Sequence, residues 1–567
     1  MMEEARKIFG IDLGTTYSCI SYVDESGNPV VVKNMEGFST TPSVVYFESE
    51  SNVVVGQTAK DSAALFPNET VSFVKRSIGK PGFSHFYNGK DLSPEEVSSY
   101  ILRKLVGDAE QQLGIEIKDV IISHPASFGI NEKAATEKAG IIAGLNVVSL
   151  IDEPVAAAYS YGCANNDSDG SVILVYDLGG GTFDVTMIEV TSEQIKVICT
   201  GGNSNLGGKL WDDAIIQYWA NQFEEQTGVP ADNLLDDPEM MQELMLKSEY
   251  AKKQLTQKDK YMAPLSFDGN KPRIEITREK FEELTEALLG QTITYTHETL
   301  KEAKAKGYDH FDKLLLVGGS TLMPQVTEAI KREFGVDPQV FDPHESVSKG
   351  AALLGYAESN RQFIRKIVQE MVDNGIIDNA DNVIGSDGNV NMDTLDEVKK
   401  AIVQQAAAEN NVNLFTLGNG AKKPVIVPVT SKSFGIIAND SDHVETLFNL
   451  ILKNTNIPCD VAQRFFTDEA NQASVLIRIC ESEVSDSKTQ VEMGVLIGEA
   501  IFDIPARLPA LSPIDVSFTL NAEGLLKITA VETTEGRECR VQIQVTNGLS
   551  EEQVNEAISA STGITVQ

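Results

Sequence analysis

The chain has 567 residues, enough for about three or four domains of ordinary size. It carries 47 Lys and Arg against 83 Asp and Glu, a formal charge of −36, which disfavours a nucleic-acid binder or a protein that binds anionic membranes. Hydrophobic residues make up 42% and charged residues 23%, as in ordinary globular proteins, so extensive disorder is also disfavoured.

The six cysteines are scattered and form no Cys-x-x-Cys pair. This pattern disfavours a disulfide scaffold and a zinc module, and it favours a reducing compartment. The first residues, MMEEARKIFGIDLG, lack an apolar core behind a basic head, and no run of about 18 apolar residues occurs. We therefore expect a cytoplasmic protein without a membrane segment.

The first 360 residues alternate short apolar strands with helical stretches, which predicts an α/β fold. Strands are predicted at 7–12, 119–124, 172–177 and 313–317, and helices at 93–113 and 131–143. Residues 361–422 are predicted to form a helical insertion. Its first helix would stop at Asn374-Gly375, a polar loop would contain Asp387-Gly388, and a second helix would follow over 393–409.

After this segment the hydrophobic period changes to two, which predicts an antiparallel β-domain with one buried face. Val475, Ile477 and Ile479 alternate with polar neighbours, and residues 514–520 and 541–545 repeat the pattern. The following residues are predicted to begin a helix capped by Ser550.

The most informative feature is a near-repeat. Residues 11–23 read IDLGTTYSCISYV and residues 176–190 read YDLGGGTFDVTMIEV, so each copy is a strand ending in Asp, a Gly/Thr turn and another strand. Because a strand follows each turn, neither copy is a Walker loop or a dinucleotide fingerprint, both of which open a helix. Such turns can still direct backbone N–H groups at phosphate, and two facing turns would hold a polyphosphate from both sides. A third glycine-rich turn, at 318–320, would let a base or ribose approach the backbone.

Carboxylates accompany these turns. Asp12 and Asp177 occupy equivalent positions in the two copies, and each could simply cap its own turn. If both lie near the phosphates, they would repel one another unless a cation lay between them, and Mg²⁺ is commonly held through few carboxylates. Glu153, at a strand end before Pro154, could orient a water, and Lys75 could stabilise the charge of a transferred phosphoryl group.

With these motifs the chain resembles the seventy-kilodalton heat-shock (DnaK-type) chaperone family over residues 7–358 and 425–550. The shared motifs are GIDLGTTYS, FVKRSIG, the Glu-Pro element, YDLGGGTFDVT, LGG at 206–208, EYAKKQLT and LLLVGGST. The resemblance implies an actin-like two-lobed ATPase domain (1–360), the helical insertion (361–422), an interdomain linker (423–430), a β-sandwich substrate-binding domain (431–548) and a residual lid helix (549–567). It also implies slow hydrolysis of ATP to ADP and phosphate, with Mg²⁺.

The resemblance also assigns roles to matching residues. Asp12 and Asp177 would hold the magnesium ion through water, and Lys75, Glu153, Asp177 and Thr182 would be catalytic. The nucleotide would be bound by Gly14, Thr15, Thr16, Tyr17, Gly179, Gly180, Gly181, Asp184, Glu249, Lys252, Lys253, Thr256, Gly318, Gly319 and Ser320.

Several positions depart from the family pattern. Leu322 replaces an Arg that often lies beside the adenine, and Lys253 stands where many members have Arg, so stacking on the base would be weaker. His344 replaces an Asp, and we expect it to be a surface histidine. Ser149 stands where the family has the Arg used by J-domain partners, and Pro428 where the linker has Asp. These changes suggest altered coupling and at most a divergent J-domain partner and nucleotide exchange factor.

In the β-domain, the resemblance places a peptide site at Phe434, Asn439, Phe465, Asp468 and Val475. Asn439 and Asp468 stand where the family has an apolar arch over the peptide, and nearly all of the helical lid is expected to be missing. We therefore expect weak binding and fast exchange of unfolded or extended polypeptides.

The leading hypothesis is an ATP-dependent DnaK-type molecular chaperone with a lidless β-domain, acting in protein folding and the stress response. The alternative is a nucleotide-stabilised scaffold or co-chaperone with little client cycling. A third reading, a small-molecule kinase or actin-like filament protein, is disfavoured because neither needs the β-domain.

Overall fold

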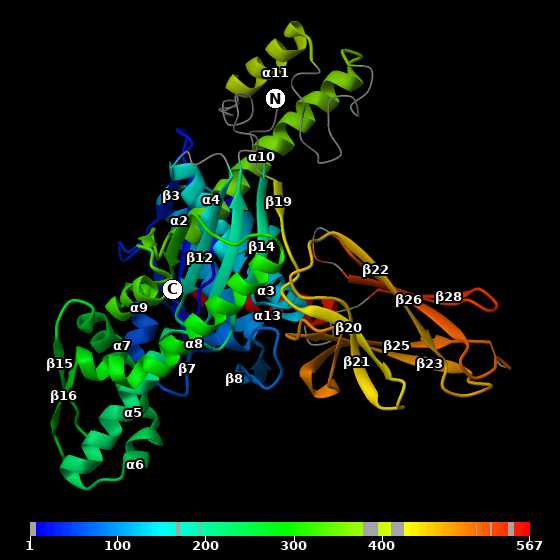
Figure 1. Ribbon diagram of the computed structural model, residues 1–567. Helices are drawn as coiled ribbons and strands as arrows, with labels where there is room; N and C mark the ends of the chain where they lie inside the picture. Colours follow the sequence, from blue (N-terminus) through cyan, green and yellow to red (C-terminus); the bar gives the residue numbers. More distant parts are fainter. Residues whose placement is uncertain are drawn as a thin grey trace.

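The computed structural model describes residues 7–165, 170–191, 194–377, 395–409, 425–505, 507–521, 524, 526–542 and 549–567. Two large mixed sheets with their helices form an α/β region, and two antiparallel sheets form a β region at its side (Figure 1). The polar loop predicted around Asp387-Gly388 lies outside the described residues, as do residues 410–424.

The first sheet of the α/β region has the strand order β11-β10-β1-β2-β3, and β4 pairs with β2. Its strands are β1 (Phe9–Asp12), β2 (Tyr17–Val23), β3 (Pro29–Val32), β4 (Thr41–Pro42), β10 (Asp119–His124) and β11 (Asn146–Asp152). Helices α2 (Pro94–Leu113) and α3 (Ile130–Ile142) pack on it. A capping box between Ser93 and Glu96 starts α2, and Gly114 ends it with a φ of 68°.

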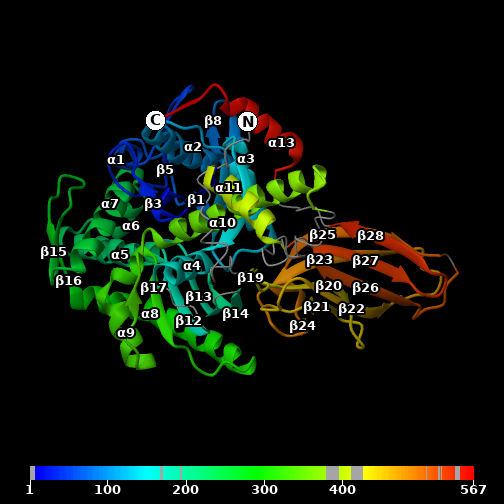
Figure 2. The ribbon, with the colours of Figure 1, turned by 90° about the horizontal axis from the view of Figure 1, so that it is seen from above.

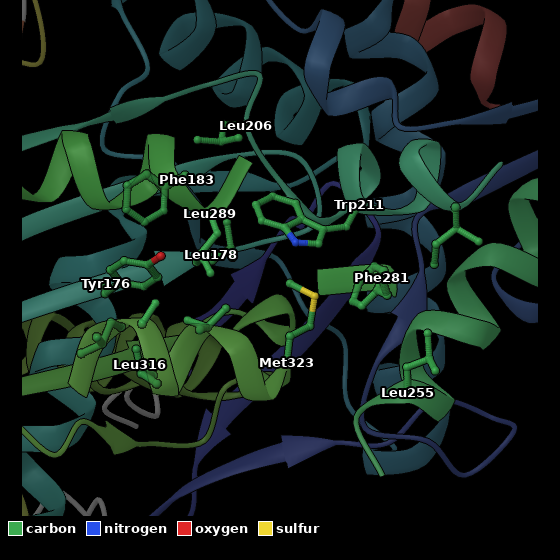
Figure 3. Close-up of a cluster of buried hydrophobic side chains, with 14 of the residues drawn as sticks. Tyr176, Leu178, Phe183, Leu206, Trp211, Leu255, Phe281, Leu289, Leu316 and Met323 are labelled. Carbon is green, nitrogen blue, oxygen red and sulfur yellow. The ribbon is translucent and has the colours of Figure 1, made fainter. Parts of the chain in front are cut away.

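The second sheet has the order β18-β17-β12-β13-β14-β19. Its strands are β12 (Ser171–Leu178), β13 (Phe183–Val190), β14 (Gln194–Asn203), β17 (Lys313–Val317), β18 (Gln339–Val340) and β19 (Val425–Val427). The helices that accompany it are α4 (Glu153–Asn165), α5 (Gly208–Thr227), α6 (Ala231–Leu235), α7 (Pro238–Leu255), α8 (Arg278–Ala305) and α9 (Pro324–Phe334). Figure 3 shows part of the core between sheet and helices, where Trp211 of α5 lies near Phe281 of α8 and Met323.

Smaller elements complete the α/β region. They are β5 (Val44–Ser49), β6 (Asn52–Val55), β7 (Thr70–Ser72), β8 (His85–Tyr87), β9 (Lys90–Leu92), β15 (Lys260–Pro264), β16 (Arg273–Thr277), α1 (Gln57–Ser62), and the 3-10 turns η1 (Val74–Ser77) and η2 (Gly319–Leu322). β6, β5 and β7 belong to a separate small sheet with the order β29-β6-β5-β7, in which β29 is Thr565–Val566.

Helix α10 runs without interruption from Ser346 to Asp373, so the predicted boundary at residue 360 falls inside a helix. Its first part packs directly on β1 and α4, because a Cβ on Gly10 would lie 2.1 Å from the Ala352 backbone and one on Gly350 would lie 1.9 Å from the Ala156 carbonyl. The predicted stop is confirmed: Asn374 caps the helix, and Gly375 follows with a φ of 69°. The second predicted helix forms α11 (Glu397–Glu409), which contacts α10.

The β region consists of two antiparallel sheets, with orders β24-β21-β20-β23-β25 and β22-β26-β27-β28. Its strands are β20 (Ser433–Asn439), β21 (Glu445–Ile451), β22 (Cys459–Phe466), β23 (Ser474–Ser482), β24 (Lys488–Thr489), β25 (Gly494–Asp503), β26 (Pro513–Leu520), β27 (Leu526–Glu532) and β28 (Arg537–Gln542). The predicted period of two is confirmed, since Ile514, Val516 and Phe518 are buried between less buried neighbours.

The chain joins the two regions at both ends of the β region. Before it, β19 adds to the second sheet in parallel with β14, so part of the predicted linker is a strand of the α/β region. After it, the helix predicted at Ser550 forms α13 (Glu551–Ser561) with a capping box, and β29 (Thr565–Val566) follows. Figure 2 shows α13, in red, beside α2 and α3 of the α/β region.

Candidate functional site

The two turns of the near-repeat face and touch each other. A Cβ on Gly180 would lie 2.4 Å from Oγ1 of Thr16, and one on Gly181 would lie 2.5 Å from Cγ2 of Thr15. A side chain at position 180 or 181 would force one of these threonines to move, and the prediction that the turns face one another is confirmed.

The third glycine turn converges on the same place. Ser320 Oγ donates to the Gly179 carbonyl at 2.9 Å, and the Gly208 amide of the 206–208 motif donates to that carbonyl, also at 2.9 Å. Gly318 has a φ of 83°, and a Cβ there would lie 2.4 Å from the Leu178 carbonyl. Glycine is therefore required both for the backbone angle and for the close approach.

The near-repeat is also a structural repeat. In the first hairpin Asp12 pairs with Cys19, and in the second Asp177 pairs with Asp184. The two copies thus place Asp12 and Asp177 at the same point of their hairpins, as the sequence predicts, and they differ in that Cys19 occupies the position of Asp184.

Acidic side chains surround one buried lysine between the turns. Lys75 Nζ lies 2.5 Å from Glu153 Oε1, and both residues and Asp177 are buried. Burial raises the pKa of Asp12 and of Glu153, and Lys75 partly offsets both shifts. Burial raises the pKa of Asp177 well above its usual value, and Glu153, Asp184 and Asp12 raise it further. The single positive charge of Lys75 does not balance the negative charges of these carboxylates, so the site would attract a further cation.

Asp184 supplies a further acceptor. Its Oδ1 accepts the Ser127 amide at 3.0 Å, while the buried Oδ2 has no hydrogen-bond partner among the described residues. Burial, followed by Glu153, raises the pKa of Asp184 to about 7. The free oxygen is suited to bind a water molecule beside Asp177.

The described residues contain no group of three or more His, Cys, Asp or Glu arranged to hold a metal by themselves. Asp12 and Asp177 nevertheless fit a magnesium ion, because Mg²⁺ keeps several waters and takes one or two carboxylates together with substrate phosphates.

A cavity of about 390 Å³ opens between these elements. Most of the predicted site residues line it: Asp12, Gly14, Thr15, Thr16, Tyr17, Lys75, Glu153, Asp177, Gly179, Gly180, Thr182, Glu249, Lys252, Lys253, Thr256, Gly318, Gly319 and Ser320. Gly181 and Asp184 do not line it; Gly181 packs on Thr15, and Asp184 lies on β13 opposite Asp177.

A polar bridge crosses the cavity between the first-sheet side and α7. Glu249 of α7 pairs with Lys60 of α1 and with Lys253, and Tyr17 donates to Glu249 at 2.8 Å. Lys60 Nζ and Lys253 Nζ each lie 2.9 Å from the Tyr17 hydroxyl. Burial alone would raise the pKa of Glu249, but the two lysines lower it to about 2. Tyr17 and Glu249 therefore bridge the two sides, a role that the sequence does not indicate.

Among the cavity residues that the sequence did not indicate are two charged ones, Lys60 and Asp212. Lys60 belongs to a six-residue helix with no motif of its own. Asp212, which pairs with Lys252 at 2.8 Å, lies one turn of α5 after Gly208, and that spacing from the 206–208 motif could have indicated it. His344 is exposed, as predicted, and its ring lies at the cavity wall against Gly319.

The residues predicted to bind peptide lie in the β region with different exposures. Asn439 Nδ2 donates to Asp468 Oδ2 at 2.9 Å, so the two arch positions meet in a polar contact. Phe465 and Val475 are half-buried, whereas Phe434 is only 3% exposed and belongs to the core. Phe434 therefore offers little surface to a ligand.

Comparison with known families places this geometry in context. The family model described as Hsp70 protein matches residues 8–86, 79–408 and 416–565, which together extend over nearly the whole chain. Among the described residues, no helix combines the length and apolar character needed to cross a membrane.

Proposed function

Because the chain belongs to the Hsp70 family of seventy-kilodalton heat-shock proteins, we propose that it is an ATP-dependent molecular chaperone of the DnaK type. Members of this family are generally ATPases that bind ATP or ADP with Mg²⁺ and that bind unfolded polypeptides. In this proposal the α/β region is an actin-like, two-lobed ATPase, and the β region binds extended polypeptide segments in the cytoplasm.

The observation that carries the proposal is the pair of touching turns with Asp12, Asp177 and Lys75 beside them. Backbone N–H groups of the two turns would hold the phosphates from opposite sides. Magnesium, held through water by Asp12 and Asp177, would neutralise phosphate charge. Lys75, fixed by Glu153, would stabilise the transferred phosphoryl group.

The remaining catalytic roles follow from position. Glu153, which lines the cavity, would accept a hydrogen bond from the attacking water and orient it. Asp184, behind the cavity wall, would shape the surrounding metal and water network through its free Oδ2. Thr182, buried where the second turn meets β13, would add a hydroxyl donor to the phosphate. The Tyr17–Glu249 bridge would close the cavity over the bound nucleotide.

Calorimetry tests the nucleotide half of this proposal. Titration of the full chain with ATP in the presence of magnesium is expected to give a single saturating heat, and chelation of magnesium is expected to weaken it. Single-turnover hydrolysis should then yield ADP and phosphate. Correctly folded protein that gives no heat with either ATP or ADP would contradict the proposal.

The bridge over the cavity leads to a first prediction. Lys60→Ala removes one of the two cations that hold Glu249, and we expect release of ADP to become about tenfold faster, the equivalent of about 1.4 kcal/mol. Stopped-flow release of a fluorescent ADP analogue measures the rate. Lys258→Ala, an exposed lysine outside the cavity, is the control. An unchanged release rate in Lys60→Ala would show that the bridge does not retain nucleotide.

Contacts between the two regions support coupling of nucleotide turnover to polypeptide binding. β19 extends the second sheet, and the Asn454 side chain pairs with the Thr200 backbone in both directions, at 2.8 and 3.1 Å. Movement of the second sheet would therefore reach the β region. The expected partners are unfolded polypeptides, with a divergent J-domain protein and an exchange factor.

The Asn439–Asp468 contact favours the second candidate, a nucleotide-stabilised scaffold or co-chaperone, because a polar arch offers little apolar contact to a client. Binding of a fluorescent apolar peptide in ADP and in ATP separates the two candidates. A change in affinity between the nucleotides favours the chaperone, and identical affinities favour the scaffold.

A further inference from the structure

Residues 549–567, hereafter the clasp, do not lie over the β region but are built into the α/β region. Val554 and Ala557 of α13 are buried against Ile142 of α3. Further along, Ile564 is buried in the same core as Phe9 and Ile11 of the first sheet. The clasp thus contributes apolar side chains to the α/β region as an ordinary element of that region would.

The clasp also adds a strand. β29 is parallel to β6, with Thr565 opposite Asn52 and Val566 opposite Val53. The Thr565 amide donates to Ser51 O at 2.9 Å, the Gln567 amide donates to Val53 O at 3.0 Å, and the Val55 amide donates to Gln567 O at 2.8 Å. The edge of β6 is therefore occupied by the chain itself.

Arg103 of α2 holds the turn between α13 and β29. Its guanidinium donates to Ser561 O at 3.0 Å and to Ile564 O at 2.7 Å. Ser561 O also accepts the Ile564 amide at 3.1 Å, so Arg103 adds a second donor at the end of α13, where a cation complements the helix dipole. Neither these contacts nor the β29–β6 pairing includes a residue that lines the cavity.

We infer that the clasp is a permanent part of the small sheet β29-β6-β5-β7 and keeps the β region docked on the α/β region in every nucleotide state. The β region is then held at its entry by β19 on β14 and at its exit by the clasp. Nucleotide turnover would adjust the docked β region without releasing it.

Amide hydrogen exchange on the full chain tests this inference in three states: ligand-free, with Mg-ADP and with Mg-ATP. The Thr565 and Val55 amides are expected to be equally protected in all three. Protection that occurs only with ATP, or in no state, would overturn the inference. The exchange measurement on the ligand-free protein does not depend on nucleotide binding. If the proposed function failed, the protection measured in that state would still test the inference.

A substitution tests whether the clasp holds the β region. Thr565→Pro removes the amide that bonds to Ser51, and we expect exchange of the Val55 amide to rise about tenfold or more. Exchange of the Thr200 amide, which donates to Asn454 at the other end of the β region, should rise as well. Gly563→Ala is the matched control, because a Cβ there meets no atom within 4 Å.

Arg103→Met provides an independent variant that keeps the apolar stem and removes both hydrogen bonds to the clasp. It is expected to have the same two effects as Thr565→Pro. If exchange of the Val55 amide rises in both variants while exchange of the Thr200 amide is unchanged, the clasp does not hold the β region in place and the inference is wrong.

Discussion

Replacing Lys75 with alanine is expected to slow single-turnover ATP hydrolysis by about a hundred- to a thousandfold. Lys75 is buried, lines the cavity beside Asp12 and Asp177, and is fixed at 2.5 Å from Glu153. A preorganised charge in such a site stabilises the transition state more than it would in water, so its loss acts mainly on the chemical step.

The same substitution is expected to destabilise the ligand-free protein by about 3–5 kcal/mol, because it leaves buried carboxylates without their cation. Urea unfolding measures this loss, and hydrolysis should be compared at saturating nucleotide on protein verified to be folded. Lys280→Ala, which removes an ion pair with Glu283 and a cation–π contact with Tyr218, both outside the cavity, is the control. Hydrolysis at the wild-type rate in Lys75→Ala would exclude Lys75 from the chemistry.

The second large effect is expected at the contact between the two regions. Lys432 lies between Glu481 at 3.0 Å and Glu132 of α3 at 3.6 Å, and all three residues are buried. Burial alone would lower the pKa of Lys432, but the two carboxylates raise it, so the lysine remains charged. Lys432→Met would leave two carboxylates facing each other and should weaken docking by about 3 kcal/mol.

Exchange of the Thr200 amide reports this docking, because it donates to Asn454 across the contact. We expect faster exchange in Lys432→Met, partial recovery when Glu481→Gln is added, and no change in the exposed control Lys527→Met. Unchanged exchange in Lys432→Met would mean that the buried charges do not contribute to docking.

The same cluster makes docking depend on pH. Burial raises the pKa of Glu481 above 4.5, an effect that Lys432 offsets in part. The Glu481 carboxyl therefore binds its proton more tightly in the docked state than in the unfolded chain. Its contribution to the stability of the docked state is greatest below pH 4.5 and declines as the pH rises through the raised pKa. Glu481→Gln should abolish this dependence, which exchange of the Thr200 amide measured from pH 4.5 to 7 would detect.

The features that the sequence predicted well depend on residues that are close together in the chain. The near-repeat carries its own strand, turn and strand signals, and two copies of one pattern adopt one geometry, which brings Asp12 and Asp177 to equivalent positions. The helix ends at Ser550 and Gly375 were predicted correctly for the same reason, because capping residues act on their immediate neighbours in the chain.

The features that it missed depend on distant partners. Lys60 pairs with Glu249, which lies 189 positions further along the chain, and no local pattern in either segment indicates this contact. β29 is two residues long, too short for any periodicity, and it becomes a strand only because β6 offers an open edge. The boundary predicted at residue 360 marks the point where the alternation of strands and helices ends, but the helical pattern has no stop signal there and α10 continues to Asp373.

The uninterrupted α10 has a mechanical consequence. Its first turn is joined to β2, since Ser348 Oγ lies 2.7 Å from Ser21 Oγ, and it starts beside the cavity, where Val347 is part of the lining. With 28 residues it is about 42 Å long. Tilting such a rod by about 10° would swing its far tip, which carries α11, by about 7 Å. Subtle rearrangement around a bound triphosphate would thus be magnified into a visible displacement of the helical insertion.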